Sequence, residues 1–130
     1  MAIIPHNLHT YKKGYYSKII GRQLVTQAVG ARSCQVWEQI IPPDGYIIPH
    51  YHDFEETITL LTGCANVQIG NIQESVSAPA TLFIPSNTIH SLTNDSKEPV
   101  HLLAFLVTGE AKVLYPDNNE LVPVVWEDES

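Results

Sequence analysis

Residues 45–56 read GYIIPHYHDFEE, and the metal-ligating side chains in this stretch decide the fold. Residues two apart on a strand face the same way, with Cα atoms about 6.6 Å apart, so His50 and His52 can converge on one ion. Glu56 would lie roughly 13 Å beyond His52 on a continuing strand, too far for metal–ligand bonds of about 2.0 to 2.2 Å. The backbone is therefore predicted to turn between them, with Asp53, a poor strand former, supplying the break.

Two neighbouring carboxylates compete for the place of the third ligand. Adjacent residues of a strand face opposite sides, so only one of Glu55 and Glu56 can face the same interior as the histidines. We predict that Glu56 opens the next strand as the ligand and that Glu55 points away.

A third histidine follows much later in the chain. His90 comes 34 residues after Glu56, beyond a turn predicted at 85–87. It can reach the other ligands only if the sheet folds back on itself as a barrel. The site thus predicts the closure of the fold.

Short apolar runs bounded by turn residues are typical of small all-β domains. The chain has nine prolines and seven glycines, spread along its 130 residues, which leaves little room for long helices. Strands rich in Val, Ile, Leu, Thr and aromatic residues are expected at 34–41, 57–61, 65–69, 81–84, 100–107 and 112–115. The chain length fits one domain with its own core.

The ligand pattern resembles the first motif of the cupin superfamily, which runs Gly, His-x-His, Glu and Gly. This sequence matches it with Gly45, His50, His52, Glu56 and Gly63, although four residues separate Gly45 from His50 where five are usual. A second matched motif makes such a resemblance far more specific than one His-x-His pair does.

The second motif of that superfamily, Pro-x-Gly-x-x-His-x-x-x-Asn, resembles residues 85–94. Asn87 stands where the family usually has Gly, and Asn is the next-best residue for a positive φ, so the turn is expected to keep its geometry. Pro79 replaces the leading Gly. The resemblance implies an all-β double-stranded β-helix, a jelly-roll barrel, with its core at about 34–110.

The same resemblance places the metal inside the barrel, on His50, His52, Glu56 and His90. Imidazole and carboxylate donors suit iron, manganese, nickel, copper or zinc, and we favour Fe(II) or Mn(II). Four protein ligands on an octahedral ion leave two positions open for substrate, dioxygen or water, which indicates a reaction site.

The charge of the chain argues against a polyanionic partner. Seven basic and fourteen acidic side chains give a net charge of −7, so binding to nucleic acid is not expected. No apolar run reaches the roughly 20 residues of a bilayer span, and the start lacks a secretion signal, so no membrane partner and a cytoplasmic location are expected. Cys34 and Cys64 lack CxxC spacing and are predicted to pack as small apolar side chains.

Residues 1–33 precede the predicted core in the sequence, and residues 111–130 follow it. The first 20 or so show neither helical nor strand periodicity, so they are interpreted as an arm packed over the barrel or over a partner subunit. A homodimer formed through this arm is a hypothesis.

Several other residues invite a function. Arg22 and Arg32 are the only arginines, and either is a surface cation or a clamp for a substrate carboxylate. His101 is a core or rim histidine, or else it lines the pocket on the same side as Leu103 and Phe105. Trp37 is expected to anchor the core.

Two functions fit these features. The first is a metal-dependent enzyme, dioxygenase-like or isomerase-like, that acts on a small organic molecule, with a metal-bound water or Glu56 released from the ion as the base. The second is a module that binds a small molecule or sugar in the same pocket without converting it, because fold alone does not separate the two.

Overall fold

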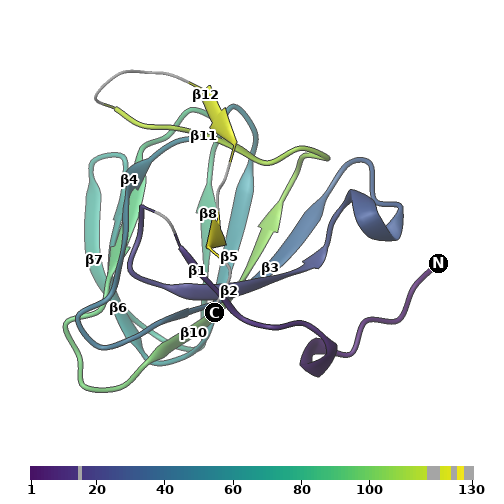
Figure 1. The fold of residues 1–130 in the computed structure, drawn as a ribbon. Coiled ribbons are helices and arrows are strands. Elements are labelled where there is room, and N and C mark those ends of the chain that lie inside the picture. Colours follow the sequence, from purple (N-terminus) through teal and green to yellow (C-terminus); the bar gives the residue numbers. More distant parts are fainter. Residues whose placement is uncertain (15, 117–120, 124–125, 128–130) are drawn as a thin grey trace.

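Two antiparallel sheets face each other in the computed structural model, which describes residues 1–14, 16–116, 121–123 and 126–127 (Figure 1). The elements are η1 (His6–Leu8), β1 (Lys12–Gly14), β2 (Ile20–Val25), η2 (Gln27–Val29), β3 (Gln35–Ile41), β4 (Tyr46–His50), β5 (Glu56–Thr62), β6 (Cys64–Ile69), β7 (Ile72–Ser77), β8 (Ala80–Ile84), β9 (His90–Thr93), β10 (Val100–Leu106), β11 (Lys112–Leu114), β12 (Leu121–Pro123) and β13 (Trp126–Glu127). None of the described helices has the length and apolar character needed to cross a bilayer.

The chain passes back and forth between the two sheets. The larger sheet has the order β13-β1-β2-β3-β10-β5-β8, the smaller one β4-β9-β6-β7, and β11 and β12 form a separate hairpin. After β3 the chain crosses to β4, returns at β5, crosses for β6 and β7, and alternates again through β8, β9 and β10. This is a jelly roll, and it confirms the predicted all-β fold class.

The core lies between the sheets, and strand β10 shows how the sequence places it there. Leu102, Ala104 and Leu106 are buried, whereas the alternate residue Phe105 is 39% exposed. Successive side chains of a strand point to opposite faces, so one face of β10 packs inward and the other faces away from the barrel. Strand β5 repeats the pattern with its own buried apolar residues.

The segment expected to be an arm is in part a component of the larger sheet. Strand β2 pairs with the free edge of β3 from Ile20 to Val25, and β1 continues the sheet beyond it. The register of β2 against β3 shifts between Gln23 and Val25. A homodimer formed through the segment remains a prediction.

One turn residue in each of the two motifs has a positive φ. Asn87 has φ 61°, so the prediction that Asn replaces Gly in a positive-φ turn is confirmed. Gly63 has φ 94°, and a Cβ atom there would lie 2.6 Å from the carbonyl oxygen of Pro99. The Asn87 amide also donates a hydrogen bond to the carbonyl of His52, which ties the second motif to the first.

The motif asparagine Asn94 is fully buried and holds the end of β9 against β3. Its amide nitrogen Nδ2 donates to the carbonyls of Ile41 and Glu98, at 2.9 and 2.8 Å, and its Oδ1 accepts from the Ser96 amide and hydroxyl. Every polar atom of the side chain therefore has a partner.

Replacing Asn94 with alanine is expected to destabilise the protein by about 3 kcal/mol, because several buried polar groups lose their partner together. Urea unfolding would measure the loss. Asn66→Ala is the matched control, since Asn66 is exposed and should cost less than about 1 kcal/mol. Equal losses in the two variants would contradict a structural role for Asn94.

Candidate metal centre

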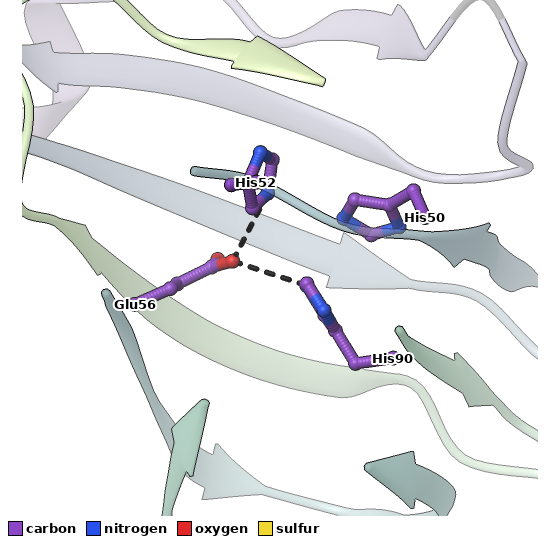
Figure 2. Close-up of side chains that lie close together, drawn as sticks. All are labelled: His50, His52, Glu56 and His90. Atoms are coloured by element: carbon purple, nitrogen blue, oxygen red, sulfur yellow. Dashed lines mark hydrogen bonds and ion pairs between the residues drawn. The ribbon is translucent and has the colours of Figure 1, made fainter. Parts of the chain in front are cut away.

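Four side chains converge between the sheets: His50 from the end of β4, His52 from the following loop, Glu56 from the start of β5 and His90 from the start of β9 (Figure 2). One ligand atom from each lies within 4.8 Å of the other three. Atoms on opposite sides of an ion with bonds of about 2.1 Å are about 4.2 Å apart, so a slight contraction would let all four share one ion. The structure thus brings together all four residues predicted from the sequence.

The loop between β4 and β5 makes this convergence possible. The prediction that His50 and His52 share one strand is wrong, because β4 ends at His50 and Tyr51 pairs instead with Leu114 of the β11–β12 hairpin. The His52 ring then turns inward and stacks on Phe54, with ring centroids 4.5 Å apart. This stacking fixes a side chain that the strand no longer orients.

The chain turns between His52 and Glu56, as predicted. Residues 53 and 54 form a bend, and β5 begins at Glu56, which is 6% exposed and faces inward. Glu55 is exposed, while its backbone carbonyl accepts a hydrogen bond from Val107. The strand parity that favoured Glu56 over Glu55 is therefore present in the structure.

Each histidine ring is oriented by a backbone carbonyl on its Nδ1 side. The Nδ1 atom lies 2.7 Å from the carbonyl oxygen of Ile48 for His50, 2.6 Å from that of Lys112 for His52, and 2.9 Å from that of Thr88 for His90. A carbonyl can only accept, so Nδ1 carries the proton and the lone pair of a neutral ring is on Nε2. Such outer hydrogen bonds orient metal-binding histidines in proteins.

The carboxylate of Glu56 is at the centre of the group. Its Oε1 lies 3.3 Å from Nε2 of His52 and 3.2 Å from Nε2 of His90 (Figure 2). Burial raises the pKa of Glu56, but its close contacts with the His52 and His90 rings outweigh that effect and hold the pKa well below the usual value. Glu56 is therefore ionised, as a ligand must be.

The electrostatic surroundings also keep His50 in its ligating form. Burial, together with the nearby His90 and His52 rings, lowers the pKa of His50 to about 3. A neutral imidazole and an ionised carboxylate are the donor forms that a transition metal requires. The donor set thus fits a divalent transition metal held by three imidazole nitrogens and one carboxylate oxygen.

The barrel interior around this group is apolar. Phe54, Ile58, Leu82, Ile84 and Leu106 are all at most 9% exposed and belong to one core cluster. Trp37 is 4% exposed in the same cluster and donates from Nε1 to Oε1 of Gln35, so it anchors the core as expected. The cluster packs around the three buried ligands, whereas His50 is partly exposed.

Three other residues singled out in the sequence lie outside the barrel interior. Arg22 faces Glu38 across the paired strands β2 and β3, with Nε 2.7 Å from Oε1, on the outer face of the larger sheet. Arg32 is exposed. His101 shares that outer face with Leu103 and Phe105, and its Nε2 lies 3.0 Å from Oε2 of Glu38, so it does not line the pocket.

These positions decide between the two alternatives for the arginines, and one prediction for a cysteine is wrong. Neither arginine clamps a substrate in the barrel, because Arg22 is committed to a buried carboxylate and Arg32 faces solvent. Cys34 is exposed and does not pack as an apolar side chain.

Glu38 is the notable residue that the sequence analysis missed. Its side chain is 3% exposed, and it meets Arg22, Tyr11, His101 and His6, the last with Nδ1 3.4 Å from Oε1. Glu38 occupies an ordinary position of a predicted strand, and its partners come from distant segments. The sequence signal for Glu38 was its position next to Trp37 on a predicted strand. Neighbouring residues face opposite sides, so Glu38 must face away from the core that Trp37 enters.

Comparisons with known proteins agree with this fold. A family model for the cupin domain matches residues 37–107. A polyketide cyclase, RemF from Streptomyces resistomycificus, superposes with a TM-score of 0.77 at 20% identity, covering 96% of this chain and 86% of that chain. A predicted oxalate decarboxylase from Thermotoga maritima has a TM-score of 0.74 at 18% identity, covering 82% and 99%.

A third structure, an RmlC-like cupin from Shewanella frigidimarina, has a TM-score of 0.71 at 9% identity and covers 83% of this chain and 91% of that chain. Identities this low show the fold alone. A search among curated proteins finds no match. Because the family model spans more than half of the 130 residues, the chain belongs to the cupin family.

Proposed function

We propose that this cupin is a metal-dependent enzyme, dioxygenase-like or isomerase-like, that acts on a small organic molecule inside the barrel. The observation that carries the proposal is the buried group of three histidines and one glutamate, in which each ring has its Nδ1 beside a carbonyl and its Nε2 available. Fe(II) and Mn(II) are the ions we favour, because a mixed imidazole and carboxylate set suits both.

The number of ligands supports a reaction site over a structural one. Structural zinc sites are closed by four protein ligands, whereas an ion that accepts six donors keeps two positions for other molecules. When bound, such an ion would polarise a carbonyl or enol oxygen of the substrate or activate dioxygen.

The chain's own residues would prepare the substrate for that chemistry. The apolar cluster around the centre excludes water, which strengthens every electrostatic interaction inside. The carboxylate of Glu56, which is held ionised beside His52 and His90, is the candidate base once it is released from the ion.

The names of two similar structures support small-molecule chemistry, since one is described as a polyketide cyclase and the other as a predicted oxalate decarboxylase. Neither name transfers to this chain at such low identity. As descriptions of proteins with the same fold, the two names favour enzymatic conversion over simple binding in this proposal.

The proposal is tested by loading the protein with Fe(II) or Mn(II) and offering diketones, thiols and aromatic diols in an oxygen electrode. Product analysis of anaerobic samples covers the isomerase version. We expect turnover of at least one compound, and its loss in His90→Ala with retention in Glu55→Ala. A compound that raises the melting temperature yet is recovered unchanged would instead favour the binding module.

A further inference from the structure

The positions of the basic side chains bear on which substrates the barrel can hold. Five of the seven are exposed: Lys12, Lys13, Lys18, Arg32 and Lys97. Arg22 binds Glu38 on the outer face of the larger sheet. Lys112 lies 3.5 Å from the exposed carboxylate of Glu110, and its neighbour Val113 is the residue of β11 that is buried. No lysine or arginine therefore lines the interior.

The two buried glutamines of β3 are neutral, and the side chain of Gln35 already has hydrogen-bond partners. Gln35 accepts from Trp37 and donates from Nε2 to the carbonyl of Gly109 at 2.9 Å. Gln39, the other buried glutamine of β3, pairs with Leu102, which pairs in turn with Leu60. Neither side chain can neutralise an anion.

The charge of the centre then limits the charge of its ligand. A divalent ion carries +2, Glu56 contributes −1, and three neutral imidazoles contribute nothing, which leaves +1. A chelating oxygen donor that binds as a monoanion brings the site to zero. A dianion leaves a net negative charge in an apolar interior without a basic side chain to offset it, which is costly.

From this charge balance we infer that the site selects a substrate that binds as a monoanionic oxygen chelator with an apolar or aromatic body, such as an enolised diketone or a phenol, and that it disfavours dicarboxylates such as oxalate. The inference rests on the metal centre of the proposed function. It separates this chain from the chemistry named for the Thermotoga maritima structure.

The cross-strand register indicates where one added cation would change this preference. Glu56 pairs with Leu106, and Leu106 pairs with Gln35, so the three residues form one inward row. Gln35 is thus two strands, about 9.6 Å, from Glu56. It also lines a hollow of about 280 Å³ at the surface, shared with exposed residues such as Gln27 and Glu110, so a longer side chain fits there without displacing core residues.

The experiment compares two chelators on Mn(II)-loaded protein: benzoylacetone, which binds as a monoanion, and oxalate, which binds as a dianion. Water-proton relaxation of Mn(II) gives the dissociation constant of each chelator from the loaded protein. Dividing it by the dissociation constant of the same chelator from aqueous Mn(II) removes the chelator's own affinity for the ion. We expect this normalised affinity to favour benzoylacetone by at least ~10-fold.

Variants provide a matched test of the cause. Gln35→Lys is expected to improve the normalised affinity for oxalate at least ~5-fold, while Arg32→Gln, at an exposed position, should change neither ligand. Thermal melting of each loaded variant confirms that it is folded. Equal or better oxalate binding by the unmodified protein would overturn the inference.

The outcomes separate the inference from the proposed function. Selective binding of benzoylacetone without turnover of any compound would sink the catalytic proposal and support the selectivity. Turnover of oxalate would do the reverse. Metal analysis before any ligand is added comes first, and a protein that retains no Mn(II) would refute both.

Discussion

Replacing His52 with alanine is expected to lower the affinity of the protein for Mn(II) by more than about 100-fold, because even outer-shell changes at metal sites cost roughly 10- to 100-fold. The Nε2 atom of His52 contacts Glu56, its Nδ1 atom contacts the Lys112 carbonyl, and its ring stacks on Phe54. Its loss removes one ligand and one support of the carboxylate together. Equilibrium dialysis with metal analysis would measure the affinity.

The matched control for this variant is Glu55→Ala. Glu55 is three residues from His52 in the sequence and Glu56 is four. The side chain of Glu55 is nevertheless exposed and lies outside the ligand group. We expect its replacement to change the affinity less than about twofold. Equal losses in the two variants would show that the register assigned to residues 50–56 is wrong.

Replacing Arg22 with methionine is expected to destabilise the protein by about 3 kcal/mol, because it leaves the buried carboxylate of Glu38 without its cation. Arg22 binds both carboxylate oxygens, with Nε 2.7 Å from Oε1 and Nη2 3.2 Å from Oε2, and its guanidinium also lies over the Tyr11 ring. Urea unfolding would measure the loss of free energy.

Two further measurements test the cause. The double variant Arg22→Met with Glu38→Leu removes both charges and should recover part of the loss. A loss below about 1 kcal/mol in Arg22→Met alone would mean that solvent, rather than the arginine, compensates the carboxylate. Neither change reaches the metal centre, so Mn(II) affinity should stay the same.

The same carboxylate predicts a pH dependence. Burial raises the pKa of Glu38, but hydrogen bonds from Arg22, His101 and Tyr11 outweigh it and hold the pKa at about 2. A lowered folded-state pKa stabilises the protein above the unfolded value near 4.5, and this contribution is lost as the pH falls toward 2. Unfolding of Glu38→Gln should therefore show a weaker acid dependence than the unmodified protein between these pH values.

Local patterns predicted the parts of the fold that depend on neighbouring residues. The positive φ of Asn87 and the turn before Glu56 follow from residue type and strand parity, and both are present. Strand β7 was not predicted, because its residues from Ile72 to Ser77 are mostly polar and exposed on both faces. Its pairing with β6 stabilises it instead. Such an edge strand leaves little periodic signal.

Contacts between distant segments could not be read in the same way. Lys112 orients His52 through its backbone carbonyl, which every residue possesses, so no side-chain pattern marks it. Arg22 and Glu38 are 16 residues apart and meet because β2 pairs with β3 in one register. A shift by one residue would place them on opposite faces.

The sequence by itself determined which side chains can serve as ligands, His50, His52, Glu56 and His90, and that the chain must close on itself for them to meet, because donor chemistry and strand parity are local properties. Only the tertiary structure decided how each ring is oriented, that the interior holds no lysine or arginine, and that Arg22 faces away from the barrel. These features depend on strand register and on backbone carbonyls brought in from elsewhere, and no single stretch of sequence encodes them.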